Sequence, residues 1–96
     1  MLDPDFLAAL GHPARLQALV LLEARPASSR EISGEVGLSP SATAYHVRKL
    51  YEVGLIVAVE TRQRRAFEER VWRTRTKGWA KLAKLLADVS QRSGKP

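Results

Sequence analysis

Apolar residues recur at intervals of three and four along the first half of the chain, which is the spacing of amphipathic helices. Asp3-Pro4 has the acid and the proline of a helix start, and the first helix stops at Gly11. His12-Pro13 starts a second helix, which Arg25-Pro26 ends. The pattern therefore predicts two short helices before residue 27.

A second pair of helices follows, joined by a short turn. Ser28 and Glu31 have the spacing of a capping box, which opens a short helix that ends at Gly37. Ser39-Pro40 repeats the arrangement of a cap followed by proline and starts the next helix. Two helices joined by a short turn with glycine form a helix-turn-helix, which we predict over residues 29–53.

The period of the apolar positions then changes from that of a helix to that of a strand. Residues 55–60 are apolar except for Glu60 and rich in β-branched side chains, and residues 61–65 form a polar, arginine-rich turn. A second, alternating strand follows, with Phe67 and Trp72 on opposite faces. The turn lacks glycine and asparagine, so it is not a tight two-residue turn. We predict a β-hairpin over residues 55–73.

A last helix is predicted over residues 77–90. Its apolar residues recur at spacings of three, four and three, a narrow stripe that is typical of two helices packed against each other. These residues are Trp79, Leu82, Leu86 and Val89. The expected fold is mainly α, with four helices, a β-hairpin and a final helix in a single domain over residues 1–96.

The second helix of the helix-turn-helix has one polar face. At about 100° per residue its apolar side chains fall on one side, with His46 at the edge. The other side carries Ser41, Ala44, Tyr45 and Arg48, flanked by Ala42 and Lys49. Such a face can enter the DNA major groove, while Ser39 and the helix N-terminus can bind a phosphate. The alternative is the solvated face of an ordinary amphipathic helix.

The net charge of +6 lies in the second half of the chain. Residues 1–50 are neutral, whereas residues 51–96 hold eleven basic and five acidic side chains. The predicted hairpin turn carries the sequence Arg62, Gln63, Arg64 and Arg65. An arginine cluster beside a DNA-reading helix suits a narrow minor groove or the flanking phosphates, and the alternative is an ordinary exposed turn.

Composition argues against several classes of protein. The chain has no cysteine, and only His12 and His46 could supply imidazole ligands, so we expect no metal site and no cofactor. No catalytic triad, carboxylate pair or glycine-rich phosphate loop is present, so we expect no enzyme. The apolar runs are shorter than the roughly 20 residues that span a bilayer. The acidic N-terminus lacks the basic region of a signal peptide, and the lack of cysteine fits a reducing compartment.

Five other residues admit two interpretations. His46 could touch a DNA phosphate or pack with a satisfied ring nitrogen. His12 is expected to cap the second helix rather than to bind a ligand, and Arg15 to anchor the fold or contact a phosphate rather than to read a base. Trp72 and Trp79 could line a ligand pocket, but the core or an interface is the better interpretation.

Three segments of the chain resemble the ArsR-like group of winged helix-turn-helix transcriptional regulators. They are LGHPARLQALVLL, REISGEVGLSPSATAYHVRKLYEVGLI and ERVWRT, and the resemblance covers about residues 6–76. It implies a small cytoplasmic homodimer that binds a palindromic operator, usually as a repressor, and that an effector often releases. It places DNA contacts at Ser41, Ala42, Ala44, Tyr45 and His46, and dimer contacts in residues 2–10 and 79–89.

The chain also departs from that group. The metal-sensing members use cysteines, or aspartate and histidine on the terminal helices, whereas here Asp88 has no histidine beside it. Ala42 and Ala44 stand where the group often has threonine and serine, so Tyr45 and the hairpin arginines are expected to contribute more of the specificity. The predicted dimer seam consists of Phe6, Leu7 and Leu10 with Trp79, Leu82, Leu86 and Val89.

The sequence therefore predicts a homodimeric, sequence-specific regulator that binds double-stranded DNA and acts as a repressor on a palindromic operator. A small-molecule effector is compatible with this function, but no residue identifies one. Two alternatives remain open. One is a winged-helix module for protein interaction or dimerisation, and the other is an architectural protein that binds all DNA sequences alike.

Overall fold

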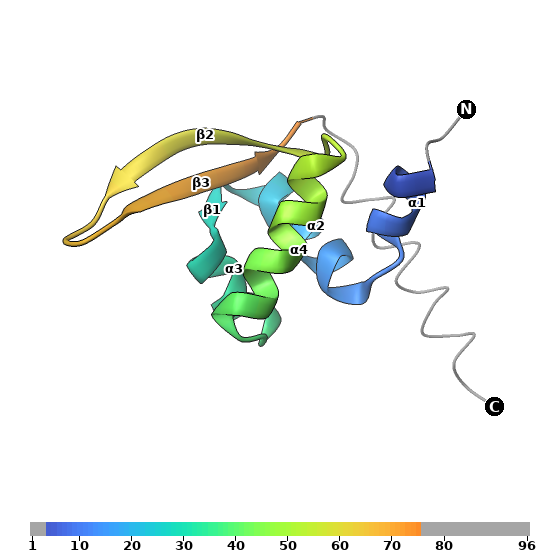
Figure 1. Ribbon diagram of the computed structural model, residues 1–96, viewed down its shortest axis with the longest axis horizontal. Helices are drawn as coiled ribbons and strands as arrows, with labels where there is room; N and C mark the ends of the chain where they lie inside the picture. The colour runs from blue at the N-terminus through green and yellow to red at the C-terminus, as the bar shows by residue number, and fades with distance from the viewer. Residues whose placement is uncertain (1–3, 76–96) are drawn as a thin grey trace.

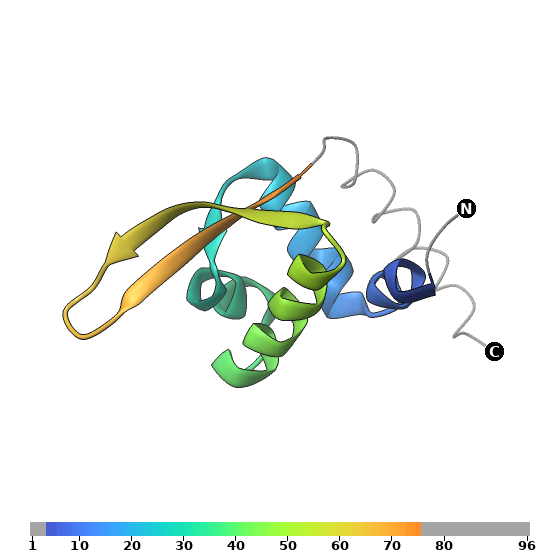
Figure 2. The same cartoon turned by 45° about the horizontal axis from the view of Figure 1, so that its top comes forward.

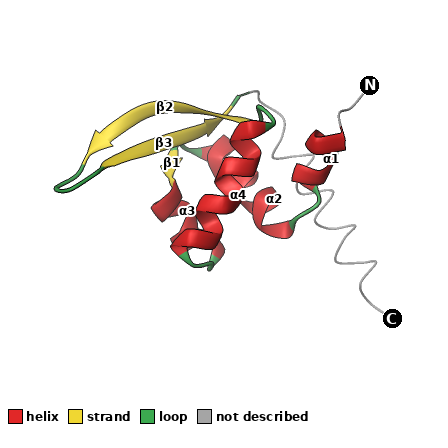
Figure 3. Ribbon diagram, in the orientation of Figure 1, coloured by secondary structure: helices red, strands yellow, loops and turns green. Residues whose placement is uncertain are grey.

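The computed structural model describes residues 4–75, in which helices and strands surround one core (Figure 1). Four helices and a three-stranded antiparallel sheet make up this part of the chain (Figure 3). Their bounds are α1 Pro4–Leu10, α2 Pro13–Ala24, β1 Ala27–Ser28, α3 Ser29–Val36, α4 Pro40–Glu52, β2 Ile56–Gln63 and β3 Glu68–Thr74. The helix predicted over 77–90, with Trp79, Leu82, Leu86 and Val89, lies outside the described residues.

Side chains that the sequence places beside each helix start provide the caps. His12 Nδ1 accepts a hydrogen bond from the backbone N–H of Ala14 at 3.1 Å, which confirms its predicted capping role. Ser28 Oγ accepts from the N–H of Glu31, and the Glu31 carboxylate accepts from the N–H of Ser28, so the capping box is complete. Ser39 Oγ caps α4 by accepting from a backbone N–H of its first turn.

The turn between α3 and α4 has a defined conformation. Gly37, which ends α3, has a φ of 73°, a left-handed value that a side chain would strain. The buried Ser33 hydroxyl donates a hydrogen bond to the carbonyl oxygen of Leu38 at 2.6 Å. These two features direct the chain back, so that α4 crosses α3 as Figure 2 shows.

The core forms around α2. Leu19 and Leu22 of this helix are fully buried and pack in one cluster with Ile32 of α3, Leu50 of α4 and Ile56 of β2. Burial of each such side chain stabilises the fold by about 1.5–3 kcal/mol. The cluster therefore joins both helices of the helix-turn-helix to the sheet and to α2.

The sheet contains a strand that the sequence pattern did not predict. The strand order is β1-β3-β2, and Ala27 and Ser28 of β1 pair with Trp72 and Val71 of β3. A strand of two residues has no periodicity that a sequence pattern could reveal. Trp72 is 7% exposed and packs in the core, which confirms the core interpretation for this residue.

The hairpin has its predicted extent, but its first strand, β2, is longer than predicted and the turn lies further along the chain. Thr61, Arg62 and Gln63, which the sequence pattern placed in the turn, belong to β2 and pair with β3. The turn covers residues 64–67, so Phe67 lies at its end and is exposed rather than on a strand face. The prediction was wrong because the polar residues of β2 are held by backbone hydrogen bonds to β3, not by their own side-chain pattern. The hairpin projects well beyond the helices, at the opposite end from α1 (Figures 1 and 2).

Candidate nucleic-acid interface

Helix α4 has one buried and one exposed face, as the helical wheel predicts. Thr43, Val47 and Leu50 are buried, and His46 is partly buried at the edge. On the other side Ser41, Ala44, Tyr45 and Arg48 are exposed, and Ala42 and Lys49 are partly exposed. Among the described residues 4–75, Arg48 has no ion-pair partner. Its guanidinium group is therefore available for a base or a phosphate.

The ring of Tyr45 is oriented by neighbours from two helices. Its centroid lies 5.9 Å from the Arg15 guanidinium carbon and 5.5 Å from Lys49 Nζ, distances at which a cation is attracted to an aromatic ring. The His46 ring meets it edge-on, with centroids 5.4 Å apart. Tyr45 is still 53% exposed. The structure thus fixes the direction of the ring while leaving much of it accessible to a ligand.

His46 is a packed residue with a satisfied ring nitrogen. Arg15 Nε donates a hydrogen bond to His46 Nδ1 at 3.1 Å, and Arg15 Nη1 donates to the carbonyl oxygen of Ala8 at 3.2 Å. The His12 ring lies against the His46 ring, with centroids 4.2 Å apart. The packing interpretation of His46 and the anchoring interpretation of Arg15 are therefore supported. Contact of His46 with DNA stays a prediction.

Lowering the pH from about 7.5 to about 5 should reduce the free energy of unfolding, because the folded chain favours neutral His46. Burial lowers the pKa of His46 from its ordinary value of 6.5, and the neighbouring His12 and Arg15 act in the same direction. A lowered folded-state pKa contributes stability that is present above the unfolded-state pKa. This contribution is lost as the pH falls through the folded-state value. Urea unfolding followed by circular dichroism at both pH values measures it.

The matched control for this prediction is His46→Asn, because an amide oxygen can accept the hydrogen bond from Arg15 without titrating. We expect the variant to lose less stability than the parent over the same pH range. The pKa values of Glu31 and Glu69 are lowered below 4.5, so these two carboxyl groups titrate at pH values below the range of this experiment. Equal losses in both proteins would show that a group other than His46 is responsible.

Two of the three arginines of the predicted hairpin turn are ion-paired within the chain. Arg62 Nη1 lies 3.2 Å from Glu31 Oε1, and Arg64 Nη2 lies 2.9 Å from Glu69 Oε1. Arg65 is exposed and has no ion pair within residues 4–75. Arg62 and Arg64 thus each already hold a carboxylate of the chain, and contact of the three arginines with DNA stays a prediction.

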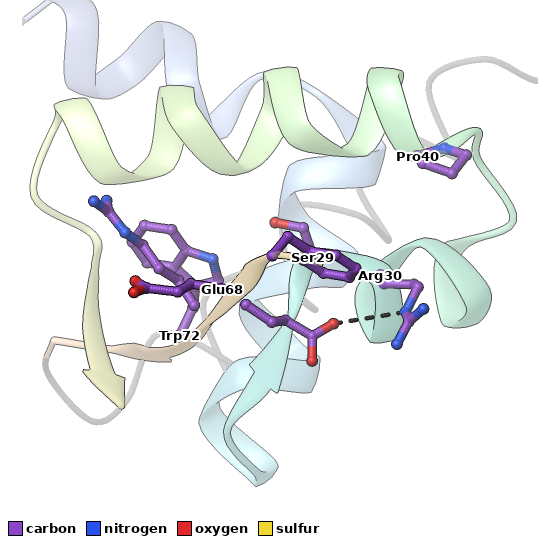
Figure 4. Close-up of a pocket in the computed structure, with 8 residues that line it drawn as sticks. Ser29, Arg30, Pro40, Glu68 and Trp72 are labelled. Atoms are coloured by element: carbon purple, nitrogen blue, oxygen red, sulfur yellow. Dashed lines mark ion pairs between the residues drawn. The ribbon is translucent and has the colours of Figure 1, made fainter. Parts of the chain in front are cut away.

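A pocket between the hairpin and the helix-turn-helix was not predicted from the sequence. Its volume is about 370 Å³, and Figure 4 shows it. Its lining consists of Ser29, Arg30, Pro40, Phe67, Glu68, Glu69, Arg70 and Trp72. Two cations, Arg30 and Arg70, and the exposed ring of Phe67 thus lie near the start of α4. One sequence feature could have pointed to this pocket. Arg30 is a cation in the first turn of α3, where it opposes the helix dipole, so its position is not explained by helix stability.

The predicted dimer contacts of α1 differ in exposure. Leu7 is 50% exposed, Phe6 is partly buried against the core, and Leu10 is buried in the core of its own chain. Leu7 is therefore the described residue of this set that is best placed to contact a second copy.

The described part of the chain contains neither a metal-binding group nor a membrane span. No cluster of three or more histidine, aspartate or glutamate side chains suitable for a metal ion occurs in residues 4–75. None of the helices in that range is both long enough and apolar enough to cross a bilayer.

Comparison with known proteins identifies a family of regulators. The family described as "Bacterial regulatory protein, arsR family" matches residues 12–57. The HTH-type transcriptional regulator YgaV of Escherichia coli (strain K12) is 39% identical over 59 residues, which make up 60% of this chain and 60% of YgaV. The matched segment thus spans less than two thirds of YgaV.

Similarity to solved structures extends over most of the chain. A structure described as a predicted DNA-binding transcriptional regulator from E. coli is 31% identical, with a TM-score of 0.63 over 86% of this chain and 83% of that chain. A homodimeric winged helix-turn-helix DNA-binding domain from Mycobacterium bovis is 23% identical. Its TM-score is 0.64 over 91% of this chain and 76% of that chain, so it shares the fold.

Proposed function

The chain belongs to the ArsR family of DNA-binding transcriptional regulators, and we propose that it acts within this family as a homodimeric repressor on a palindromic operator. In this proposal α4 is the reading helix and the β2–β3 hairpin is the wing. The DNA-binding residues are Ser39 and those predicted on α4, together with Gln63 and Arg65 of the wing. Arg62 and Arg64, which are also predicted to contact DNA, each pair with a carboxylate of the chain.

The exposed face of α4 carries the proposal. Ser41, Ala44 and Arg48 share that face with the oriented ring of Tyr45. The small side chain of Ala44 lets the helix approach the base edges closely. Arg48 can donate two hydrogen bonds to a guanine, and Tyr45 offers a hydroxyl group and a flat surface for a thymine methyl group. A face of this composition has the donors and the apolar contacts that distinguish base pairs in a major groove.

The exposed side chain of Leu7 supports pairing of two chains through α1. A half-exposed leucine next to the partly buried Phe6 leaves apolar surface uncovered at the end of the molecule away from the wing tip (Figure 1). The M. bovis domain with the same fold is homodimeric, which also supports the proposal. Two reading helices related by a two-fold axis would enter successive major grooves about 34 Å apart.

Replacing Leu7 with glutamate should convert the dimer to monomers. A charged side chain at an apolar seam loses the hydrophobic contact and places two like charges opposite each other in a symmetric pair. Val59→Glu is the control, because Val59 is similarly exposed but lies on β2. Light scattering after size exclusion measures the mass of each protein. A Leu7→Glu protein that keeps the dimer mass would place the seam elsewhere.

A selection from random duplex DNA tests the proposed function as a whole. The purified protein retains duplexes at near-physiological salt, and the retained pool is sequenced. A palindrome with half-sites about one helical turn apart is the expected result. Retention without a shared sequence would show an architectural DNA binder, and no retention at any salt concentration would favour a protein-interaction module. Transcription from a promoter that carries the recovered site then distinguishes repression from activation.

A further inference from the structure

Two carboxylates join the wing to the start of α3. Glu31 Oε1 lies 3.2 Å from Arg62 Nη1, while it also accepts the capping hydrogen bond from the N–H of Ser28 at 2.9 Å. Glu69 Oε1 lies 2.9 Å from Arg64 Nη2 and accepts a hydrogen bond from Arg64 Nε at 3.0 Å. Each carboxylate therefore holds an arginine from β2 or the wing turn.

Glu69 also holds an arginine of the helix-turn-helix. Its second oxygen, Oε2, lies 3.6 Å from Arg30 Nε in the first turn of α3, the ion pair drawn as a dashed line in Figure 4. The Glu69 side chain is only 8% exposed, whereas the side chains of Arg30 and Arg64 are 66% and 41% exposed. A buried carboxylate thus lies between two accessible cations, one from the wing and one from α3.

Glu69 is charged at neutral pH despite its burial. The hydrogen bond from Arg64 lowers the pKa of the Glu69 carboxyl group and outweighs the effect of burial, and the Ser28 hydroxyl and Arg30 act in the same direction. Ion pairs shielded from water are weakened less by salt than exposed ones. The Glu69 carboxylate is itself shielded from water, so salt weakens its pairs less than it weakens pairs between two exposed groups.

We propose that Glu69, together with Glu31, is a positioning residue that makes DNA binding sequence-specific by holding Arg30, Arg62 and Arg64 away from phosphates. This inference rests on the proposed function, because it assigns a role within DNA binding. A phosphate that approaches Arg64 must compete with a carboxylate already in hydrogen-bond contact. Sequence-independent attraction to the wing is reduced, and the contacts of α4 with the bases then contribute a larger share of the binding free energy.

Arg65 differs from the arginines that Glu31 and Glu69 hold. It is exposed in the wing turn and has no ion pair within residues 4–75. Its repulsion from the neighbouring Arg64 is reduced, because Glu69 neutralises that residue. The wing turn therefore offers the guanidinium group of Arg65 to DNA, near the exposed ring of Phe67. Without the two carboxylates, the same surface would offer Arg30 and Arg64 as further cations to any polyanion, and Arg62 would keep only its pair with Glu60 at 3.6 Å.

The test compares two neighbouring substitutions that change the charge equally. Glu69→Gln removes the carboxylate that holds Arg30 and Arg64, whereas Glu68→Gln removes an exposed carboxylate that has no ion pair within residues 4–75. Affinity is measured for the selected operator and for a random duplex across a salt series. In Glu69→Gln the log–log salt slope on random DNA should steepen by about 2 per dimer for each arginine released. The ratio of operator to random affinity should fall.

Glu68→Gln should leave both the slope and that ratio close to those of the parent. Equal changes in the two variants would overturn the proposal, because net charge alone would then explain them. Thermal unfolding of both variants shows whether they are folded. If Glu69→Gln does not fold, Arg64→Ala and Arg65→Ala in the parent take its place. Arg64→Ala should then cost less random-duplex affinity than Arg65→Ala, and the reverse order would overturn the proposal.

Retention on heparin separates failure of this inference from failure of the proposed function. Heparin is a polyanion without base sequence, so it reports the release of arginines even if the protein binds no duplex. Glu69→Gln should elute at higher salt than Glu68→Gln. Equal elution would overturn the role of Glu69. If Glu69→Gln elutes later than Glu68→Gln but the selection recovers no operator, the role of Glu69 in holding the arginines is supported. Sequence-specific regulation is then rejected.

Discussion

Replacing Arg48 with alanine should weaken binding to the selected operator by about 10- to 100-fold for each half-site, the equivalent of the roughly 1–3 kcal/mol that each good bidentate contact with a base contributes. The effect is expected because Arg48 is exposed on α4 and, within residues 4–75, has no ion-pair partner that already uses its donors. Affinity for a random duplex should fall much less. Fluorescence anisotropy with both duplexes at one salt concentration gives the two values.

Arg73→Ala is the matched control, because it removes the same charge from an exposed position on β3, outside the α4 face. We expect it to change operator and random affinity by similar small factors. Equal losses on both duplexes for Arg48→Ala would assign Arg48 to the DNA backbone rather than to a base. Tyr45→Phe then tests the hydroxyl group alone, since the ring keeps its contacts with Arg15 and Lys49.

Replacing Leu50 with alanine should lower the free energy of unfolding by about 2–5 kcal/mol, the range for truncating a buried leucine. Leu50 is fully buried in the core cluster, where α4 meets α2 and the sheet. A domain of this size has a total stability of about 5–15 kcal/mol, so the loss is a large fraction of the total. Urea unfolding followed by circular dichroism measures it.

Gln17→Ala is the control for Leu50→Ala, because Gln17 is exposed on α2 and its truncation leaves no cavity. A change within about 0.5 kcal/mol is expected there. A loss at Leu50 as small as that at Gln17 would contradict the packing of α4 described above. DNA affinity of Leu50→Ala, measured under conditions where the protein is folded, should change little if Leu50 acts only through stability.

The helix ends could be predicted from the sequence because their signals are local. Ser28 and Glu31 lie three residues apart, and each side chain bonds to the other's backbone, so the capping box needs no distant partner. Gly37 ends α3 with a conformation set by its own lack of a side chain. The two faces of α4 could be predicted for the same reason, since the helical period of about 3.6 residues per turn decides which side chains lie together.

The ion pairs and the extra strand could not be predicted, because they depend on residues far apart in the sequence. Arg62 meets Glu31 only after β3 pairs with β1 and brings the hairpin over the start of α3. Arg15 meets His46 only after α2 and α4 pack in one core. The sequence pattern showed that the wing is rich in arginine, but it did not show which acids would already hold these side chains.

The pairing of β1 with β3 also determines the order in which the nascent chain can fold. Ala27 of β1 pairs with Trp72 of β3, so these partners leave the ribosome at widely separated times. Synthesis proceeds at about 5–20 residues per second, and contacts across long sequence separations form more slowly than local ones. The helix-turn-helix can therefore form its caps during synthesis, but it becomes fixed to the wing only after β3 has emerged. DNA recognition that uses α4 and the wing together accordingly begins only once β3 has been synthesised.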